Sequence, residues 1–396
     1  MKVLVLTTVF PNCKQPALGT FVRERMFRVA KECELKVVAP VPWFPFAGYL
    51  KPNYRPMVPR KEIQQGIEVY HPRFFSIPGV LKCLDGIFFF LSLLSPLRRI
   101  RNNFDFDIID AHFSYPEGLG AVLLARFFNR PVTITLRGTI VPLSKYLLRR
   151  VQIIYALRNA TKVFSVSNSL KEKAVSLGIE SSKILPIPNG VDMEKFFPVP
   201  KDEARQELDL LLDKKIIISV GGLVKRKGFH RVLAVLPEVT EKYKEILYVI
   251  VGGPTVEGDL GPELKKQVKE LNLDGHVHFT GPLPHDQVRK WLNAADIFCL
   301  ATSNEGWANV FFEAMACGKP VVTTKVGGNE EVVKSANYGI LVDLDDQKQL
   351  KDAIIEALEK KWDHRKIIEY ASENNWENVA RKVLQELNDI VAIFSQ

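Results

Sequence analysis

Two carboxylates, Glu305 and Glu313, stand eight residues apart where a strand-like run gives way to a helix-like one. The apolar run 295–301 precedes them, and the helical pattern stops at Gly318, with Pro320 just beyond. Glycine favours the left-handed cap of a helix, and proline cannot continue one. In α/β proteins, ligands bind at the carboxyl ends of strands, and backbone N–H groups at a helix start attract phosphate. The pattern predicts a site for a phosphate-bearing ligand, although a glutamate at a helix start often only compensates the helix dipole.

A glycine-rich loop, residues 221–228, follows the strand-like run 215–220 and carries three consecutive basic residues that end in Lys227. Such a loop suits a diphosphate, because lysine and arginine bind phosphate oxygens and glycine exposes backbone N–H groups. It differs from the nucleotide-binding P-loop, which needs another glycine spacing and a Ser or Thr after the lysine. The loop predicts a diphosphate site, and the alternative is a solvated basic turn.

The first half of the chain offers three candidates at strand ends. Gly19 lies just before a helix-like stretch, His112 ends the strand-like run 106–112, and Arg137 follows the run 131–136. The carboxyl ends of parallel strands share one edge of a sheet, so these residues are expected on the same side. Each also has an ordinary explanation, as a turn glycine, a structural histidine or a surface charge.

Two possible metal sites are rejected. Asp105 and Asp107 form an Asp-x-Asp pair, but the pair opens a strand and no other oxygen ligands accompany it. His276 and His278 lie on a strand-like run without a cysteine nearby. The five cysteines are scattered, which is typical of reduced thiols in a cytoplasmic protein.

The positions of these residues depend on an alternation of strands and helices that occurs twice. With 396 residues, the chain exceeds what one hydrophobic core usually supports. The alternation predicts an α/β fold with two Rossmann-like domains facing a cleft. The Asn-Gly turn at 189–190 and the prolines at 198 and 200 indicate a boundary near 195–205.

The order of residues across 305–322 resembles the donor-site signature of one enzyme family. The shared pattern is Glu-Gly-aromatic-x-Asn-x-x-x-Glu-Ala-x-Ala-x-Gly-x-Pro-Val-Val, and it resembles the retaining GT-B glycosyltransferases of family four, the group-one glycosyl transferases. The resemblance extends over nearly the whole chain. It implies an acceptor domain over 1–198, a donor domain over 199–375, and a last helix, 376–396, that packs back on the first domain.

The resemblance also implies roles for individual residues. Glu305 would contact the donor sugar near its reacting carbon, Glu313 the ribose, and Lys227 the diphosphate. The implied catalytic residues are Glu305, His112, Lys227 and Arg226, and the implied donor-binding residues are Gly19, Arg137, Gly222, Gly306, Trp307, Ala308, Asn309, Val310 and Glu313. Relatives usually carry arginine where Gly222 stands, and many carry histidine at Arg137. We expect Arg226 to supply the missing guanidinium.

The expected reaction is metal-independent transfer of a hexosyl group from a nucleoside diphosphate sugar, such as a UDP-sugar, to an acceptor hydroxyl, with retention of configuration. No cofactor and no metal are expected. Attack on the same face as the leaving phosphate and a covalent glycosyl intermediate both stay open. The expected context is cell-surface polysaccharide or glycolipid synthesis. The alternatives are a GT-B-shaped nucleotide-sugar epimerase or phosphorylase, or a non-catalytic carbohydrate- or membrane-surface-binding protein.

Charge is unevenly distributed along the chain. Residues 1–200 carry a net charge of +14 and residues 201–396 a net charge of −5. No nucleic-acid-binding motif accompanies the basic half, so an anionic membrane is the better partner. The aromatic stretch 40–59 and the apolar run 87–95 are candidates for that contact, or for a packed core. We expect a cytoplasmic protein, peripheral on the inner face of the cell membrane, with a saccharide or lipid-linked acceptor.

Overall fold

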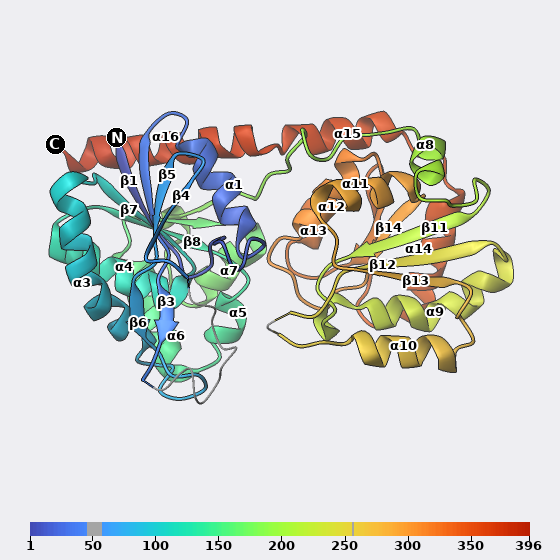
Figure 1. The fold of residues 1–396 in the computed structure, drawn as a ribbon, viewed down its shortest axis with the longest axis horizontal. Coiled ribbons are helices and arrows are strands. Elements are labelled where there is room, and N and C mark those ends of the chain that lie inside the picture. Colours follow the sequence, from blue (N-terminus) through green and yellow to red (C-terminus); the bar gives the residue numbers. More distant parts are fainter. Residues whose placement is uncertain (46–57, 256) are drawn as a thin grey trace. The chain divides into compact units, whose positions relative to one another are not determined.

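The computed structural model of the chain describes residues 1–45, 58–255 and 257–396. The chain divides into two compact units, Met1–Asn189 with Trp376–Gln396, and Gly190–Asn375. In both units, helices cover a sheet of mainly parallel strands (Figure 1).

The sheet of the first unit has the strand order β10-β9-β8-β7-β1-β2-β5-β4. All neighbours are parallel except β4, which pairs antiparallel with β5. The order reverses between β1 and β7, which is the switch point where Rossmann-like sheets bind ligands. The strands are β1 (Lys2–Leu6), β2 (Glu34–Val38), β4 (Lys61–Gln64), β5 (Ile67–Tyr70), β7 (Ile108–His112), β8 (Val132–Leu136), β9 (Lys162–Ser165) and β10 (Ile184–Pro186).

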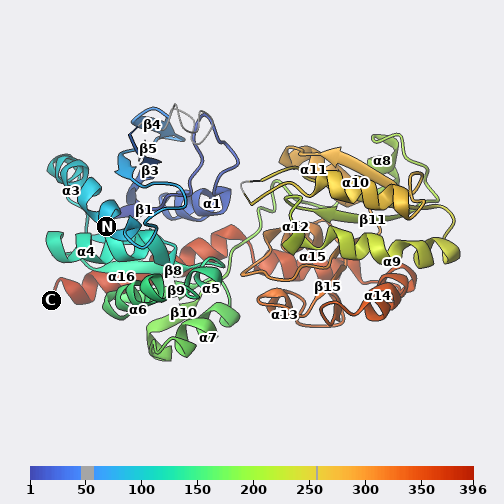
Figure 2. The same cartoon turned by 90° about the horizontal axis from the view of Figure 1, so that it is seen from below.

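Helices of the first unit connect these strands and cover both faces of the sheet (Figure 2). They are α1 (Thr20–Val29), α3 (Asp85–Asn103), α4 (Leu119–Phe128), α5 (Ile140–Leu143), α6 (Leu147–Asn159), α7 (Asn168–Ser176) and the final helix α16 (Trp376–Phe394), with short turns at Ser114–Gly118 and Ser181–Lys183. The last helix belongs to this unit because Val379, Val383 and Leu387 are buried in the same core as Val22 and Met26 of α1.

The aromatic stretch after β2 is partly strand. β3 (Val41–Trp43) pairs in parallel with β6 (Arg73–Phe75), so this segment forms a small second sheet. Residues 46–57 of the expected interfacial stretch lie outside the described residues. The run 87–95 lies in α3, which buries Phe89 and Leu93 and exposes Ile87 and Leu91. One side of the helix is therefore core, and the other is surface.

The second unit repeats the doubly wound pattern with the all-parallel order β13-β12-β11-β14-β15-β16. Its switch point lies between β11 and β14. The strands are β11 (Lys215–Val220), β12 (Ile246–Val251), β13 (Val277–Gly281), β14 (Ile297–Leu300), β15 (Val321–Thr324) and β16 (Gly339–Val342). The helices are α8 (Lys201–Gln206), α9 (Phe229–Lys242), α10 (Gly261–Glu270), α11 (His285–Ala294), α12 (Asn309–Ala316), α13 (Asn329–Val332), α14 (Gln347–Glu359) and α15 (His364–Glu373), with a short turn at Lys225–Lys227.

The division between the units falls at 189/190, before the expected boundary at 198/199. Residues 190–198 pack with the second unit for two reasons. The Val191 N–H donates to Asn374 O at 3.0 Å, and Phe196 is buried in the second core. The prolines that suggested the later boundary lie just before α8, inside the second unit.

Helix α12 ends just before Gly318, the glycine that the sequence predicted would terminate it. Gly318 adopts a left-handed φ of 74° and donates its N–H to Met315 O at 2.8 Å. The Lys319 N–H then reaches back to Ala314 O at 2.9 Å. These bonds satisfy the last carbonyls of the helix, and the chain enters β15 at once. The compact turn keeps β14, α12 and β15 in register, so the loop carrying Glu305 has fixed ends.

Candidate functional site

Two cations and a carboxylate meet at the switch point of the second sheet. The Lys227 ammonium and the Arg226 guanidinium both bind Glu305 Oε1, the latter through Nη1 at 3.1 Å. Glu305 is 9% exposed and Lys227 14%, so the pair is largely shielded from water. Lys227 and Arg226 come from the loop after β11 and Glu305 from the loop after β14. The structure thus joins two motifs that lie far apart in the sequence.

Close backbone packing fixes these two loops against each other. The Arg226 carbonyl accepts bonds from the Ser303 N–H at 2.7 Å and the Thr302 hydroxyl at 2.8 Å. Gly228 has a φ of 77°, and a Cβ there would lie 1.8 Å from Ala301 O. Only glycine allows the β11 loop to approach the end of β14 this closely.

Backbone contacts also hold Glu305 from the other side. The Gly328 N–H donates to Glu305 O at 3.1 Å. A Cβ on Gly327, whose φ is 54°, would lie 2.0 Å from the same oxygen. The loop after β15 therefore fixes the Glu305 backbone, while the side chain faces the cations.

Arg226 has a second acidic partner that the sequence did not suggest. Its Nε and Nη2 bind the Glu257 carboxylate at 2.7 and 2.9 Å, a bidentate pair. Hydrogen bonding to Glu257, with the charge of Glu305, raises the pKa of Arg226. Two carboxylates therefore balance the two cations. An incoming diphosphate would compete with these carboxylates for the positive charge of Arg226 and Lys227.

Gly222 marks the departure from the family pattern. A Cβ at this position would lie 2.3 Å from the Thr255 methyl group. A side chain here would have to displace Thr255, so this loop is shaped for glycine. Arg226, four residues on, is the guanidinium that contacts the carboxylate shared with Lys227.

The predicted donor-binding run 306–310 spans the end of a loop and the start of a helix. Gly306, Trp307 and Ala308 precede α12, and Asn309 and Val310 begin it. The Trp307 ring stacks on Phe312 with centroids 5.6 Å apart, which ties the loop to the helix. The backbone of this run is thus anchored at both ends.

Glu313 lies one turn into α12 and is half-buried. Burial raises the pKa of its carboxyl to about 7, although Lys195 and Lys227 partly oppose this. The side chain is therefore close to half protonated at neutral pH. A carboxyl group in this condition changes its hydrogen-bonding capacity within the physiological range.

The predicted residues of the first unit lie near its switch point. His112 ends β7, Arg137 follows β8, and both side chains are buried. Arg137 Nη2 lies 3.4 Å from His112 Nδ1, and His112 Nε2 lies 3.3 Å from Asp110 Oδ2. Burial lowers the pKa of His112 despite the opposing charge of Asp110. Gly19 caps α1 with a φ of 69°, where a Cβ would lie 2.3 Å from Val9 O.

Arg25 is a buried cation that sequence reasoning missed. Its Nη2 donates to Ile187 O and Pro188 O at 2.9 Å and to Asn189 Oδ1 at 3.2 Å, where Arg137 Nη1 also donates. Burial lowers the pKa of Arg25 to about 10, against the opposing charge of Asp110. The position of Arg25 in α1 gave no signal, because the contact forms only when α1 meets the segment 187–189 that follows β10.

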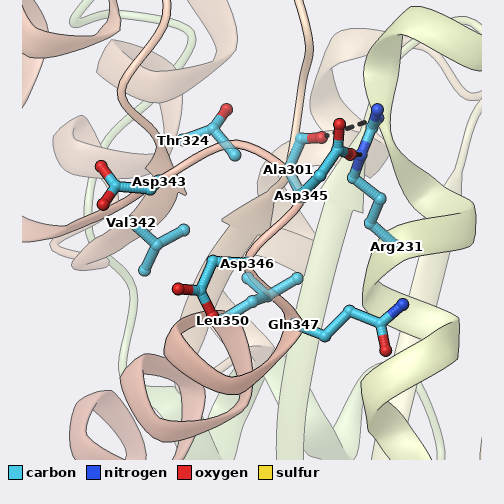
Figure 3. A pocket seen from close by; sticks show the side chains of 9 residues that line it. All are labelled: Arg231, Ala301, Thr324, Val342, Asp343, Asp345, Asp346, Gln347 and Leu350. Carbon is cyan, nitrogen blue, oxygen red and sulfur yellow. Dashed lines mark hydrogen bonds and ion pairs between the residues drawn. The ribbon is translucent and has the colours of Figure 1, made fainter.

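A cavity of about 70 Å³ lies at the carboxyl ends of β14, β15 and β16 (Figure 3). Asp343, Asp345 and Asp346 line it, and Arg231 from α9 binds Asp345 at 2.6 Å and donates to Ala301 O at 3.4 Å. The other lining residues are Ala301, Thr324, Val342, Gln347 and Leu350. Its acidic lining disfavours a diphosphate, which leaves the Lys227 loop as the better phosphate site.

The rejected metal candidates have structural partners. Asp105 binds Arg101 and Arg130, each at 2.9 Å, and Asp107 accepts the Lys2 backbone N–H at 2.6 Å. His276 Nδ1 lies 3.1 Å from Ile246 O. Within residues 1–45, 58–255 and 257–396, no group of three or more His, Cys, Asp or Glu side chains could hold a metal ion.

Comparison with known proteins bears on both halves of the chain. The family "Glycosyltransferase Family 4" matches residues 28–195, and "Glycosyl transferases group 1" matches residues 200–374. Over 336 residues, 83% of this chain and 82% of the relative, the sequence is 31% identical to TuaC of Bacillus subtilis, named as a candidate teichuronic acid biosynthesis glycosyltransferase. The chain is a family-four glycosyltransferase. An uncharacterised glycosyltransferase of Methanocaldococcus jannaschii is 25% identical over 374 residues, covering 90% of this chain and 99% of that one.

Solved structures place this glycosyltransferase in the GT-B fold. Sucrose-phosphate synthase of Thermosynechococcus elongatus superposes with a TM-score of 0.82 at 20% identity, covering 99% of this chain and all of that one. Anabaena HepE, solved with UDP, gives a TM-score of 0.75 at 18% identity, covering 98% of this chain and 100% of that one. The GT-B fold expected from the sequence is thereby confirmed. In the part of the glycosyltransferase that the structure describes, no helix is long and apolar enough to cross a membrane.

Proposed function

We propose that this glycosyltransferase transfers a hexosyl group from a UDP-sugar to a saccharide or lipid-linked acceptor hydroxyl, with retention of configuration and without a metal ion. The reaction would serve cell-surface polysaccharide or glycolipid synthesis on the cytoplasmic side. The observation that carries the proposal is the Lys227–Glu305–Arg226 cluster at the β11/β14 switch point.

The cluster suits the departure of a nucleoside diphosphate. Charge builds on the leaving phosphate as the glycosidic bond breaks, and fixed cations stabilise that charge. Lys227 and Arg226 supply two positive charges on a loop locked by Gly228. Glu305, displaced from one of them, would then face the positive charge that develops on the sugar ring. The start of α12 and Glu313 would hold phosphate oxygens and ribose hydroxyls.

Retention is proposed from the family and has a simple chemical route. The acceptor hydroxyl attacks the anomeric carbon on the face that the diphosphate leaves, and the departing phosphate oxygen takes its proton. The new glycosidic bond forms as the bond from carbon to phosphate oxygen breaks, so no external base is needed. A covalent intermediate would instead need a carboxylate free to attack the anomeric carbon, whereas Glu305 keeps one of its two cation partners even when the diphosphate displaces the other.

Relatives support the substrate class. The name of TuaC points to teichuronic acid, a polysaccharide, and HepE has been solved with UDP and with UDP-glucose. The test is a thermal-shift series with UDP-, GDP- and ADP-sugars, followed by turnover with the nucleotide-sugar that stabilises most. We expect stabilisation by a UDP-sugar and a product with retained anomeric configuration by NMR. A product that is only an epimerised nucleotide-sugar or a sugar phosphate would overturn glycosyl transfer in favour of an epimerase or a phosphorylase.

Glu313 should make nucleotide binding depend on pH. Its pKa is raised to about 7, so it is mostly protonated at about pH 6 and ionised at about pH 8. The ionised group accepts bonds from both ribose hydroxyls, so UDP affinity should rise about 3- to 10-fold over this range. Calorimetric titration of UDP measures it. Glu313→Gln should remove this part of the pH dependence, whereas titration of the nucleotide phosphate is common to both proteins. An unchanged profile in the variant would contradict a ribose contact.

A further inference from the structure

Helix α6 of the first unit exposes an apolar stripe to solvent. Leu147, Leu148, Val151 and Tyr155 are 72%, 62%, 58% and 37% exposed. Their spacing places them within about 100° of one another around the helix. The opposite side of α6 is buried and carries Ile153, Ala156 and Leu157. The helix is therefore anchored in the core by one side while the other presents large apolar side chains to water.

A second group of exposed apolar residues surrounds the start of α3. Val80 and Leu81 are each 53% exposed, Leu84 and Ile87 each 39%, and Leu91 55%. The last three lie on one side of the helix by their spacing. Soluble proteins seldom expose large apolar residues in such clusters without a binding role.

One hydrogen bond, and helix α4, which packs against both α3 and α6, link the two groups. Gln152 Nε2 on α6 donates to Cys83 O at 2.8 Å, just before α3. Arg126 of α4 donates to the Tyr155 hydroxyl at 2.7 Å. We call the combined surface the apolar patch; it consists of Val80, Leu81, Leu84, Ile87, Leu91, Leu147, Leu148, Val151 and Tyr155.

The charges around the apolar patch have one sign. Residues 118–171 contain nine lysines and arginines and no aspartate or glutamate. In 79–103 the one acidic residue is Asp85, which is buried and paired with Lys82 at 2.8 Å. The basic residues on or beside α3, α4 and α6 include Arg98, Arg99, Arg126, Lys145, Arg149 and Arg150. Apolar side chains rimmed by arginine and lysine match a surface that is both lipidic and anionic.

The apolar patch reaches the ligand-binding edge of its own sheet. Helices between parallel strands run opposite to them, so α3 and α6 both begin at the edge where β7 and β8 end. Tyr115, three residues after His112, donates its hydroxyl to Lys82 O at 2.7 Å and accepts the Gly86 N–H at 3.3 Å. The patch therefore adjoins the strand ends that carry His112 and Arg137.

We propose that the apolar patch docks this glycosyltransferase onto an anionic lipid membrane, with the α6 side chains entering the interface. Helix α6 has 13 residues, too few to span a bilayer but enough to lie in its surface. A second copy of the chain is a poorer occupant, because two basic rims would face each other. The inference adds a partner to the proposed function but does not depend on turnover, since membrane binding needs neither donor nor acceptor.

Vesicle co-sedimentation of the full chain tests the docking. Phosphatidylcholine vesicles mixed with phosphatidylglycerol should bind the protein, pure phosphatidylcholine vesicles should bind it much less, and salt should weaken binding. Leu147→Ser with Leu148→Ser should lower the partition coefficient about ten- to a hundred-fold, because both side chains leave the interface. The matched control is Leu211→Ser with Leu212→Ser, which changes two leucines 58% and 48% exposed in the second unit.

Three outcomes would overturn membrane docking. They are no binding to mixed vesicles, equal binding by the patch variant and the wild type, and a wild-type dimer that the patch variant converts to a monomer in light scattering. The last result would assign the patch to a second copy of the chain. Melting temperatures within a few degrees of the wild type show that the variants are folded. A protein that binds vesicles but transfers no sugar would leave docking intact and remove only the proposed function.

Discussion

Replacing Lys227 by alanine should lower kcat/KM for the nucleotide-sugar about 30- to 1,000-fold. This corresponds to about 2–4 kcal/mol of lost transition-state stabilisation, the range for one preorganised charged contact. Lys227 is the more buried of the two cations on Glu305, at 14% exposed against 36% for Arg226, so its charge acts in the drier surroundings. Binding of UDP should weaken as well, because the same ammonium meets the ground-state diphosphate.

Lys225→Ala is the matched control for this variant. Lys225 stands in the same short turn, Lys225–Lys227, but its side chain is exposed. We expect near-normal kinetics from it. Steady-state kinetics of both variants, with melting temperatures to show intact folds, decide the assignment. If Lys227→Ala keeps wild-type kcat/KM, or if both variants lose activity equally, the loop is only a general basic surface.

Sequence patterns predicted the strands of the second unit better than its helices. The expected run 215–220 coincides with β11. The strand that the sequence predicts directly after Pro320, over 321–324, coincides with β15, because buried parallel strands are continuous apolar runs. For the helix after the 221–228 loop, the sequence predicts an end near Leu236, before Pro237, but α9 continues through Pro237 to Lys242. Val239, one turn further, is fully buried in the same core, so packing outweighs the hydrogen bond that proline removes.

At the start of α7, several consecutive residues could each cap the helix, so the local sequence does not identify the N-cap. The sequence predicts Asn168 or Ser169 as the N-cap of the helix that begins near Leu170, yet the cap is Ser167, whose hydroxyl accepts the Leu170 N–H at 3.3 Å. Serine and asparagine both cap helices well. The choice depends on where β9 ends and on how deeply Leu170 is buried, and a local pattern carries neither fact.

The candidate site was predictable where glycine-rich loops follow strands. Lys227 and Glu305 lie in such loops, and the resemblance to a family ranked them above other charged residues. Glu257 and Arg25 gave no comparable signal. Glu257 lies 31 residues from Arg226, and Arg25 lies 164 residues from Asn189. These contacts exist only through tertiary packing, so the charge balance of each cluster could not be foreseen.

The charge balance around Arg226 and Lys227 gives Glu305 a second role, in addition to its proposed contact with the donor sugar. Glu305 neutralises Lys227 and shares Arg226 with Glu257. A bound diphosphate competes with it for the same cations. We therefore expect Glu305 to weaken donor binding in the ground state. In the transition state it should raise the rate, because its negative charge stabilises the positive charge on the sugar ring. Affinity and turnover should respond in opposite directions to its removal.

Glu305→Gln should lower kcat about 30- to 1,000-fold, again about 2–4 kcal/mol, while the affinity for UDP alone rises. Glutamine keeps the size of the side chain but removes the charge that faces the sugar and competes with phosphate. Steady-state kinetics and UDP calorimetry on one preparation measure both effects.

The matched control is Glu257→Gln, which removes the other carboxylate that binds Arg226. The Glu257 side chain is half-exposed, whereas that of Glu305 is buried. Glu257→Gln should also raise UDP affinity and leave kcat near the wild-type value. Equal kcat in the two variants would mean that Glu305 only balances charge, and wild-type turnover in Glu305→Gln would remove it from the reaction.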